Sequence, residues 1–140
     1  MPILFDSSVY ITALRVGGDT LLLQRWAREA PLWLSAVVLE ELYAGARSED
    51  RKILEKLERD FAKANRILVP SLGDWTFAGR ILAGIGQAHG YEKIGRARLT
   101  NDALIAVSAA RNGIQVITAN ARDYELLAQF CALRWEKRML

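Results

Sequence analysis

Short apolar runs that are followed by helical patterns set the strongest constraint on how this chain can fold. Such runs lie at residues 2–5, 32–34, 67–69 and 115–118, and a last one lies near 132–135. Runs of this kind are typical of strands that are covered on both faces of a parallel sheet. They predict an α/β protein with three layers (α/β/α) and a short central parallel sheet of four to five strands.

Helical patterns fill the segments between these runs. The clearest spans residues 49–65, where Leu54, Leu57 and Phe61 form one apolar stripe and the dense charges form a solvated opposite face. Further helices are expected at residues 9–15, 20–29, 36–45, 71–89, 101–112 and 122–129. The expected N-caps are Ser7 or Ser8, then Ser35, then Ser71 or Asp74, and then Thr100 or Asn101.

Length and composition indicate one globular domain over residues 1–140, because the chain shows no internal repeat and no linker. The single cysteine, Cys131, excludes an internal disulfide. An acid already at residue 6 argues against a signal peptide, and no apolar run approaches the roughly 18 residues of a membrane span. We therefore expect a soluble cytoplasmic protein, and its net charge of +3 permits a nucleic-acid partner without requiring one.

Four acidic side chains recur near predicted strand ends and helix starts: Asp6, Glu41, Asp102 and Asp123. In an α/β fold, such positions converge on one edge of the sheet. A cluster of carboxylates repels itself in water and needs a cation, and Mg²⁺ or Mn²⁺ prefer oxygen ligands. The pattern favours metal-dependent phosphodiester chemistry.

The motifs around these acids resemble those of a known family. The motifs are Asp6-Ser7-Ser8 and the segments at residues 39–45, 101–106 and 118–124. In this order and spacing they are similar to the successive motifs of PIN-domain ribonucleases, and above all to the VapC-type toxins of VapBC toxin–antitoxin modules. The resemblance covers residues 3–135.

The resemblance implies a metal-binding and catalytic role for each of the four acids. Asp6 matches the first acid of the family, Glu41 the second, within the Glu-Leu-x-x-Gly pattern, and Asp102 the third. Glu40 competes with Glu41, but neighbouring residues on a helix point about 100° apart, and the family pattern favours Glu41.

The fourth acid departs from the family pattern. Asn120 is neutral where the family has a polar or acidic residue, and Tyr124 replaces the Phe that usually follows the last acid. Asp123 is therefore the expected fourth carboxylate, and the choice between it and Asn120 stays open.

Other residues are expected to support the reaction. Ser8 and Thr118 are candidate hydroxyl donors that orient a carboxylate or a water. The candidates for binding the RNA backbone are Lys93, Arg96, Arg98 and Arg122. The only histidine, His89, lies at a predicted helix end, which argues against a histidine-based ribonuclease.

The resemblance implies a Mg²⁺-dependent endoribonuclease (Mn²⁺ is possible) that acts as a toxin. The ion would polarise the scissile phosphate and lower the pKa of a bound water. The implied partners are the RNA substrate, an antitoxin that blocks the acidic site with a basic side chain, and a second copy of the chain in a homodimer. No membrane partner is expected.

Two other functions remain open. A phosphoacceptor signalling domain also gathers acids and Mg²⁺ at a parallel-sheet edge, but it needs an acidic pair after the first strand and a lysine after the last. Here Ser7 and Ser8 follow Asp6, and we expect no lysine near Thr118. The other alternative is an interaction module with a degenerate site, which retained affinity for Mg²⁺ would exclude.

Overall fold

The computed structural model describes residues 1–15, 28, 30–90, 92 and 99–138. Within them, five strands form one sheet in the order β3-β2-β1-β4-β5, and every neighbouring pair is parallel. The strands are β1 (Ile3–Phe5), β2 (Leu32–Ser35), β3 (Ile67–Leu68), β4 (Gln115–Thr118) and β5 (Trp135–Lys137). The predicted α/β fold with a short parallel sheet is confirmed.

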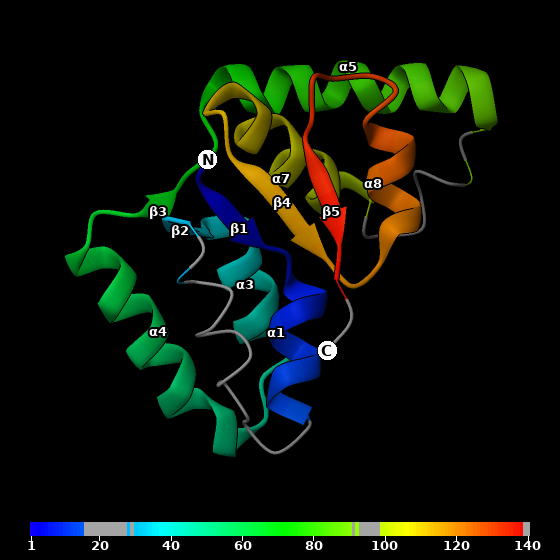
Figure 1. Ribbon diagram of the computed structural model, residues 1–140. Helices are drawn as coiled ribbons and strands as arrows, with labels where there is room; N and C mark the ends of the chain where they lie inside the picture. Colours follow the sequence, from blue (N-terminus) through cyan, green and yellow to red (C-terminus); the bar gives the residue numbers. More distant parts are fainter. Residues whose placement is uncertain (16–27, 29, 91, 93–98, 139–140) are drawn as a thin grey trace.

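Helices flank this sheet (Figure 1). They are α1 (Ser7–Arg15), α3 (Ala36–Ala44), α4 (Arg51–Lys63), α5 (Leu72–His89), α7 (Leu99–Arg111) and α8 (Ala121–Leu127), with a short 3₁₀ turn, η1 (Ser48–Asp50), before α4. The helix predicted at residues 20–29 lies outside the described residues, apart from Arg28. No helix of the described chain is long and apolar enough to span a membrane.

The core is built on α7, whose residues from Ala103 to Ala109 are all buried. This helix packs against α5, α8, α3 and β4, so it has no wide polar face. Ser108 is tolerated inside the core because its hydroxyl donates to the carbonyl of Leu104 at 2.6 Å. The position of Asp102, in the first turn of α7, is therefore fixed by packing along the whole helix.

An ion pair joins α5 to α7. Asp74 is 2% exposed, and Arg111 donates to its two carboxylate oxygens from Nε and from a terminal nitrogen, both at 2.8 Å. Asp74 also forms a capping box with Ser71, whose backbone N–H donates to the carboxylate at 2.9 Å. Ser71 is thus the N-cap of α5, and Asp74 is the third residue of that helix.

Several predicted boundaries were wrong. Helix α1 begins at Ser7 and not at residue 9, so Ser7 and Ser8 lie inside it, and α4 spans Arg51–Lys63 and not residues 49–65. Helix α7 begins at Leu99, so Thr100 and Asn101 lie inside the helix and do not cap it; burial of Leu99 brings the first turn into the core. The last strand is Trp135–Lys137 and not 132–135, because pairing with β4 sets its register and places Lys137 opposite Thr118. A lysine therefore does lie beside Thr118, contrary to the sequence-based expectation.

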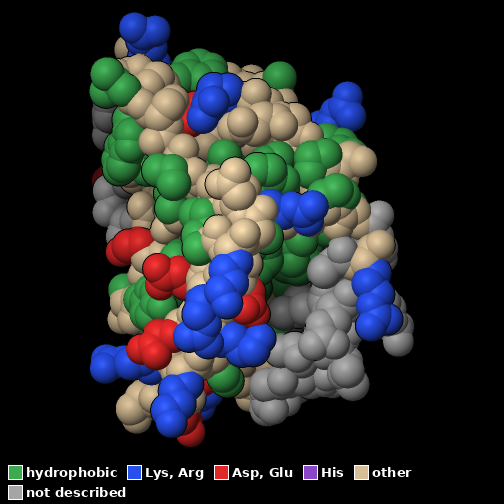
Figure 2. Space-filling model, turned by 90° about the vertical axis from the view of Figure 1, so that its left-hand side faces the viewer, with side chains coloured by type: hydrophobic (Ala, Val, Ile, Leu, Met, Phe, Trp, Pro, Cys, Tyr) green, Lys and Arg blue, Asp and Glu red, His purple; other side chains and the backbone are tan. Residues whose placement is uncertain are grey.

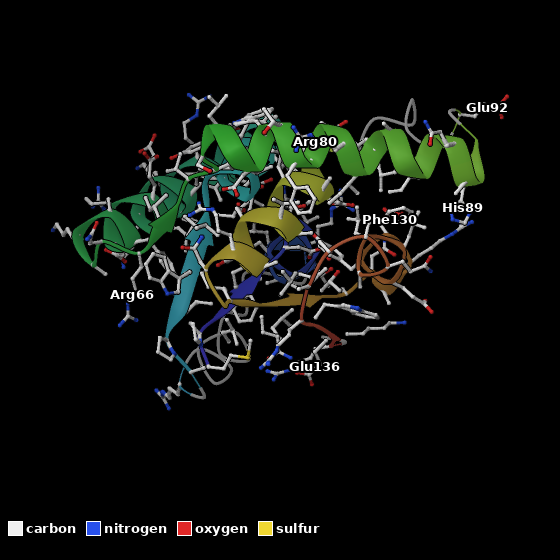
Figure 3. The ribbon with its side chains drawn as sticks, turned by 90° about the horizontal axis from the view of Figure 1, so that it is seen from above. Arg66, Arg80, His89, Glu92, Phe130 and Glu136 are labelled. Carbon is white, nitrogen blue, oxygen red and sulfur yellow. The ribbon has the colours of Figure 1, made fainter. Side chains whose placement is uncertain are left out.

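The outer surfaces differ in character. Figure 2 faces α4, where lysine and arginine side chains form a band beside acidic ones, and Lys56 pairs with Asp60 at 2.7 Å. The start of α5 instead exposes large apolar side chains, with Leu72 at 79% and Trp75 at 55%. Near the other end of α5, a Cβ on Gly84 would lie 3.2 Å from the Phe130 ring, which Figure 3 shows beneath the helix.

Candidate active site

The carboxyl ends of β1 and β4 meet at one edge of the sheet, because these parallel strands are neighbours and Phe5 pairs with Ile117 (Figure 1). Asp6 directly follows β1 and is 5% exposed. Burial raises the pKa of this carboxyl, although hydrogen bonds from Ser8 and Thr118 oppose the shift. Asp6 is a buried acid held in place at the sheet edge.

Two hydroxyl groups hold the Asp6 carboxylate from opposite sides. Ser8 donates to one oxygen from both its backbone N–H and its hydroxyl, and Thr118 donates to the other oxygen at 2.7 Å. The Ser8 hydroxyl also accepts from the Ala119 N–H at 3.2 Å, and the Thr118 hydroxyl accepts from the Asn120 N–H at 2.9 Å. The two predicted supporting hydroxyls therefore tie α1 to the end of β4 through Asp6.

Glu41 lies in the second turn of α3 and is half-buried, whereas Glu40 is exposed. Its carboxylate is hydrogen-bonded by Asn101 and Ser7. Burial raises the pKa of Glu41, and the charges of Glu40 and Asp6 raise it further. One oxygen, Oε1, is buried and has no hydrogen-bond partner. Of the two glutamates, Glu41 is the one that faces the other acids.

Among these acids, Asp102 has the pKa that is shifted most. Its pKa rises to about 8, first because of burial, then because of the charge of Asp123, and then because of Asp6 and Glu41. Asp102 also shares a hydrogen bond with Asp123, from the first turn of α8. The structure therefore brings the other three predicted acids within electrostatic reach of Asp102.

Asn120 is the N-cap of α8, but its side chain makes no capping bond and is exposed. Asp123, not Asn120, is the side chain that contacts Asp102. Sequence reasoning missed three site residues: Ser7 and Asn101, which bond Glu41, and Tyr124, whose hydroxyl lies 3.5 Å from Asp102. All three belong to the motifs quoted above, but Ser7 and Asn101 were interpreted as helix caps.

Of the four residues predicted to contact RNA, Arg122 lies in the described part of the chain. Lys93, Arg96 and Arg98 lie outside the described residues, while Arg122 is exposed in the first turn of α8, beside Asp123. His89 is exposed at the end of α5 (Figure 3), and no described acid of the cluster contacts it. The described chemistry at this edge is therefore carried by carboxylates, hydroxyls and amides.

A family model described as the PIN domain matches residues 3–128 of the chain. The chain belongs to the PIN-domain family. PIN domains are generally nucleases, so the acid cluster lies in a domain of hydrolytic enzymes. This membership, and not the position of Lys137, decides against the phosphoacceptor interpretation.

Several solved structures share this PIN fold. VapBC2 from Rickettsia felis, bound to a DNA fragment from its promoter, is 20% identical with a TM-score of 0.67, over 99% of this chain and 100% of that one. DNA-bound VapBC from Salmonella typhimurium is 19% identical with a TM-score of 0.67, over 98% of both chains. FitAcB from Neisseria gonorrhoeae is 21% identical with a TM-score of 0.66, over 96% of both chains. At these identities the likeness shows the fold alone. No curated protein matches the chain.

The PIN-domain acids have the donor chemistry of a Mg²⁺ or Mn²⁺ site, because all are carboxylates and Glu41 offers a buried oxygen with no partner. As they stand, no three acidic, histidine or cysteine side chains among the described residues are close enough to enclose one ion. Mutual repulsion favours such a spread arrangement. The residues fit the ion by type and location, and small side-chain rotations would have to bring their oxygens close enough to coordinate it.

A cavity of about 440 Å³ opens beside Glu41 in this PIN domain. It lies between α1 and the end of α3, and Ser7 and Asn101 line it at the acid cluster. Ile11 and Leu14 supply an apolar wall. The cavity therefore joins an apolar surface to the acidic site.

Without metal, the stability of the PIN domain should fall as pH rises. The pKa of Asp102 is about 8 in the folded state against an ordinary 3.8, so its bound proton stabilises the fold. That contribution is complete below about pH 4 and is lost as pH rises through about 8. Urea unfolding in EDTA should give a lower midpoint at pH 8.5 than at pH 5.5. An equal or higher midpoint at pH 8.5 would contradict the packing of these acids.

Proposed function

We propose that this PIN domain is a Mg²⁺-dependent endoribonuclease and the toxin of a toxin–antitoxin pair. The observation that carries the proposal is the position of Asp102, whose pKa is raised by the charges of Asp123, Asp6 and Glu41 together. Four carboxylates from four separate segments are costly to hold together without a cation. Such a cost is expected where the cluster serves a reaction.

Each acid has a defined task in the proposal. Asp6, Glu41, Asp102 and Asp123 would hold the metal, and the bound metal would supply charge stabilisation and an acidified water. Thr118 and Ser8 fix the orientation of Asp6, as Asn101 and Ser7 do for Glu41. Partners of this kind typically contribute 10–100-fold to metal affinity or activity, so they are expected to matter nearly as much as the ligands.

The substrate would be RNA, held by its backbone. Arg122 is exposed directly beside Asp123, and it makes no ion pair with another described residue. A guanidinium in this position suits a phosphate next to the scissile bond. Lys93, Arg96 and Arg98, which lie shortly before Asp102 in the sequence, stay candidates for the same task.

An antitoxin would occupy the cavity beside Glu41. The similar structures from Rickettsia felis, Salmonella typhimurium and Neisseria gonorrhoeae are two-component VapBC or FitAcB structures. The apolar wall of Ile11 and Leu14 suits an apolar segment, and the adjoining Glu41 suits a basic side chain. A partner bound there would block the acids.

A second copy of the chain would complete the assembly. The exposed apolar side chains at the start of α5, among them Leu72 and Trp75, are a candidate surface for this homodimer. Analytical ultracentrifugation of the wild type and a Trp75→Glu variant would test it.

The proposed activity predicts metal-dependent cleavage of RNA. Purified protein with Mg²⁺ or Mn²⁺ should convert total cellular RNA into discrete products, and EDTA should abolish them. An Asp60→Asn variant, which changes an exposed acid on α4, should cleave like the wild type. Calorimetric metal binding without any cleavage would remove RNA as the substrate, and absence of metal binding would favour the degenerate interaction module.

A further inference from the structure

Tyr124 is a buried phenol that reaches the acid cluster from α8. It is 1% exposed, and its hydroxyl lies 3.5 Å from Oδ1 of Asp102. Within the described part of the chain, this carboxylate is the only hydrogen-bond partner of the hydroxyl. The phenol faces the acids as a hydrogen-bond donor.

We propose that Tyr124 is a positioning residue, which orients the Asp102 carboxylate for metal binding through its hydroxyl. The inference rests on the proposed function, because it assigns a task within the same site. It assigns that task to a residue that is not one of the four proposed metal ligands.

The geometry gives a hydrogen-bond donor at this place a specific task. Asp102 shares a hydrogen bond with Asp123 on one side and meets Tyr124 on the other. A donor fixed on one oxygen holds the carboxylate plane and leaves the other oxygen for the site.

The length of this contact is also informative. At 3.5 Å it exceeds the usual 2.5–3.0 Å of an O–H···O bond, so the hydroxyl and the carboxylate are not yet fully engaged. The phenol is fixed by packing, since its ring is buried between α7 and α8, whereas Asp102 is only partly buried. Tightening of the bond therefore requires a rotation of the Asp102 side chain, and metal binding would supply one.

The chain contains a matched control in Tyr10. It is 7% exposed, its ring packs edge-on against Phe5 with centroids 5.8 Å apart, and its hydroxyl is buried without a hydrogen-bond partner in the described structure. A Phe substitution at either tyrosine removes one buried hydroxyl and keeps the ring. Only the Tyr124→Phe variant removes a group that faces Asp102.

The test is Mn²⁺ titration calorimetry on metal-free wild type, Tyr124→Phe and Tyr10→Phe proteins, followed by RNA cleavage kinetics. Tyr124→Phe should weaken the affinity for Mn²⁺ by about 10-fold, the lower end of the range for such partners. At limiting metal, kcat should fall while KM for RNA stays unchanged. Tyr10→Phe should leave affinity and kinetics as in the wild type.

The outcomes separate the two proposals. Equal Mn²⁺ affinity in the wild type and Tyr124→Phe would overturn the positioning role and leave the nuclease proposal standing. A lower melting temperature of Tyr124→Phe without any change in affinity would make Tyr124 a packing residue only. A wild type that binds no Mn²⁺ would overturn the proposed function, and the inference would fail with it.

Discussion

An Asp102→Asn variant will lose RNA cleavage and, without metal, will be more stable than the wild type at alkaline pH. Loss of a ligand should cost more than loss of a residue that only supports one, so cleavage should fall more than about 100-fold. Stability should change in the opposite direction, because the folded state disfavours the charged form of Asp102. The amide mimics the neutral acid at every pH.

The size of the stability difference depends on pH. At pH 3.5 the wild-type Asp102 is protonated in both the folded and the unfolded state, so the two proteins should differ little, and the advantage of the variant should grow as pH rises toward 8. At pH 8.5 the wild type bears the cost of the charge, and the free energy of unfolding of the variant should be higher by on the order of 5 kcal/mol. Urea unfolding in EDTA at the two pH values measures this difference.

Adding Mn²⁺ should make the wild type more stable than Asp102→Asn. The metal should raise the melting temperature of the wild type and have little effect on that of Asp102→Asn. Asp60→Asn serves as the control, since it removes an exposed acid from α4 and should behave as the wild type with and without metal. Metal-dependent cleavage by Asp102→Asn would rule out the assigned role of this acid.

An Asp74→Ala variant will unfold at lower urea concentration, by about 2–3 kcal/mol, because a buried pair loses one member and α5 loses part of its capping box. The cost should stay below the 3–5 kcal/mol typical of broken buried pairs, since the Arg111 side chain is 48% exposed and its charge can be rehydrated. Lys56→Ala, which breaks an exposed pair, should cost less than about 0.5 kcal/mol.

A fall in pH should weaken the contribution of Asp74 to stability, whereas it strengthens that of Asp102. The neighbouring Arg111 holds the pKa of Asp74 below its ordinary 3.8, so the stabilisation is present above that value and is lost as pH falls below it. The variant should therefore lose less stability than the wild type between pH 5 and pH 2.5. Equal acid sensitivity of both proteins would show that Asp74 does not stabilise the fold through its charge.

Local sequence was sufficient for the elements whose boundaries are set by local chemistry. The strands β1, β2 and β4 match their predicted apolar runs to within one residue, and Ser35 accepts from the N–H groups of Val37 and Val38 as a predicted N-cap. The last strand was displaced because its register depends on β4, which no local pattern encodes. The start of α7 was missed because burial of Leu99 overrides the capping preference of Thr100.

Local sequence was likewise sufficient for some features of the candidate site and not for others. The acids could be recognised, because each occupies a typical position at a strand end or in a helix. The contact between Asn101 and Glu41 could not, since it joins segments 60 residues apart and depends on how α3 packs against α7. The contact of Tyr124 with Asp102 likewise exists only once α8 has packed against α7.

The adjacency of β1 and β4 has a consequence for synthesis of the protein. Asp6 emerges from the ribosome well before the Thr118 hydroxyl that holds it, which follows 112 residues later. A nascent chain that ends before α7 contains Asp6 and Glu41 but neither Asp102 nor Asp123. The acidic centre therefore cannot assemble until the segment that carries Asp102 and Asp123 has been translated.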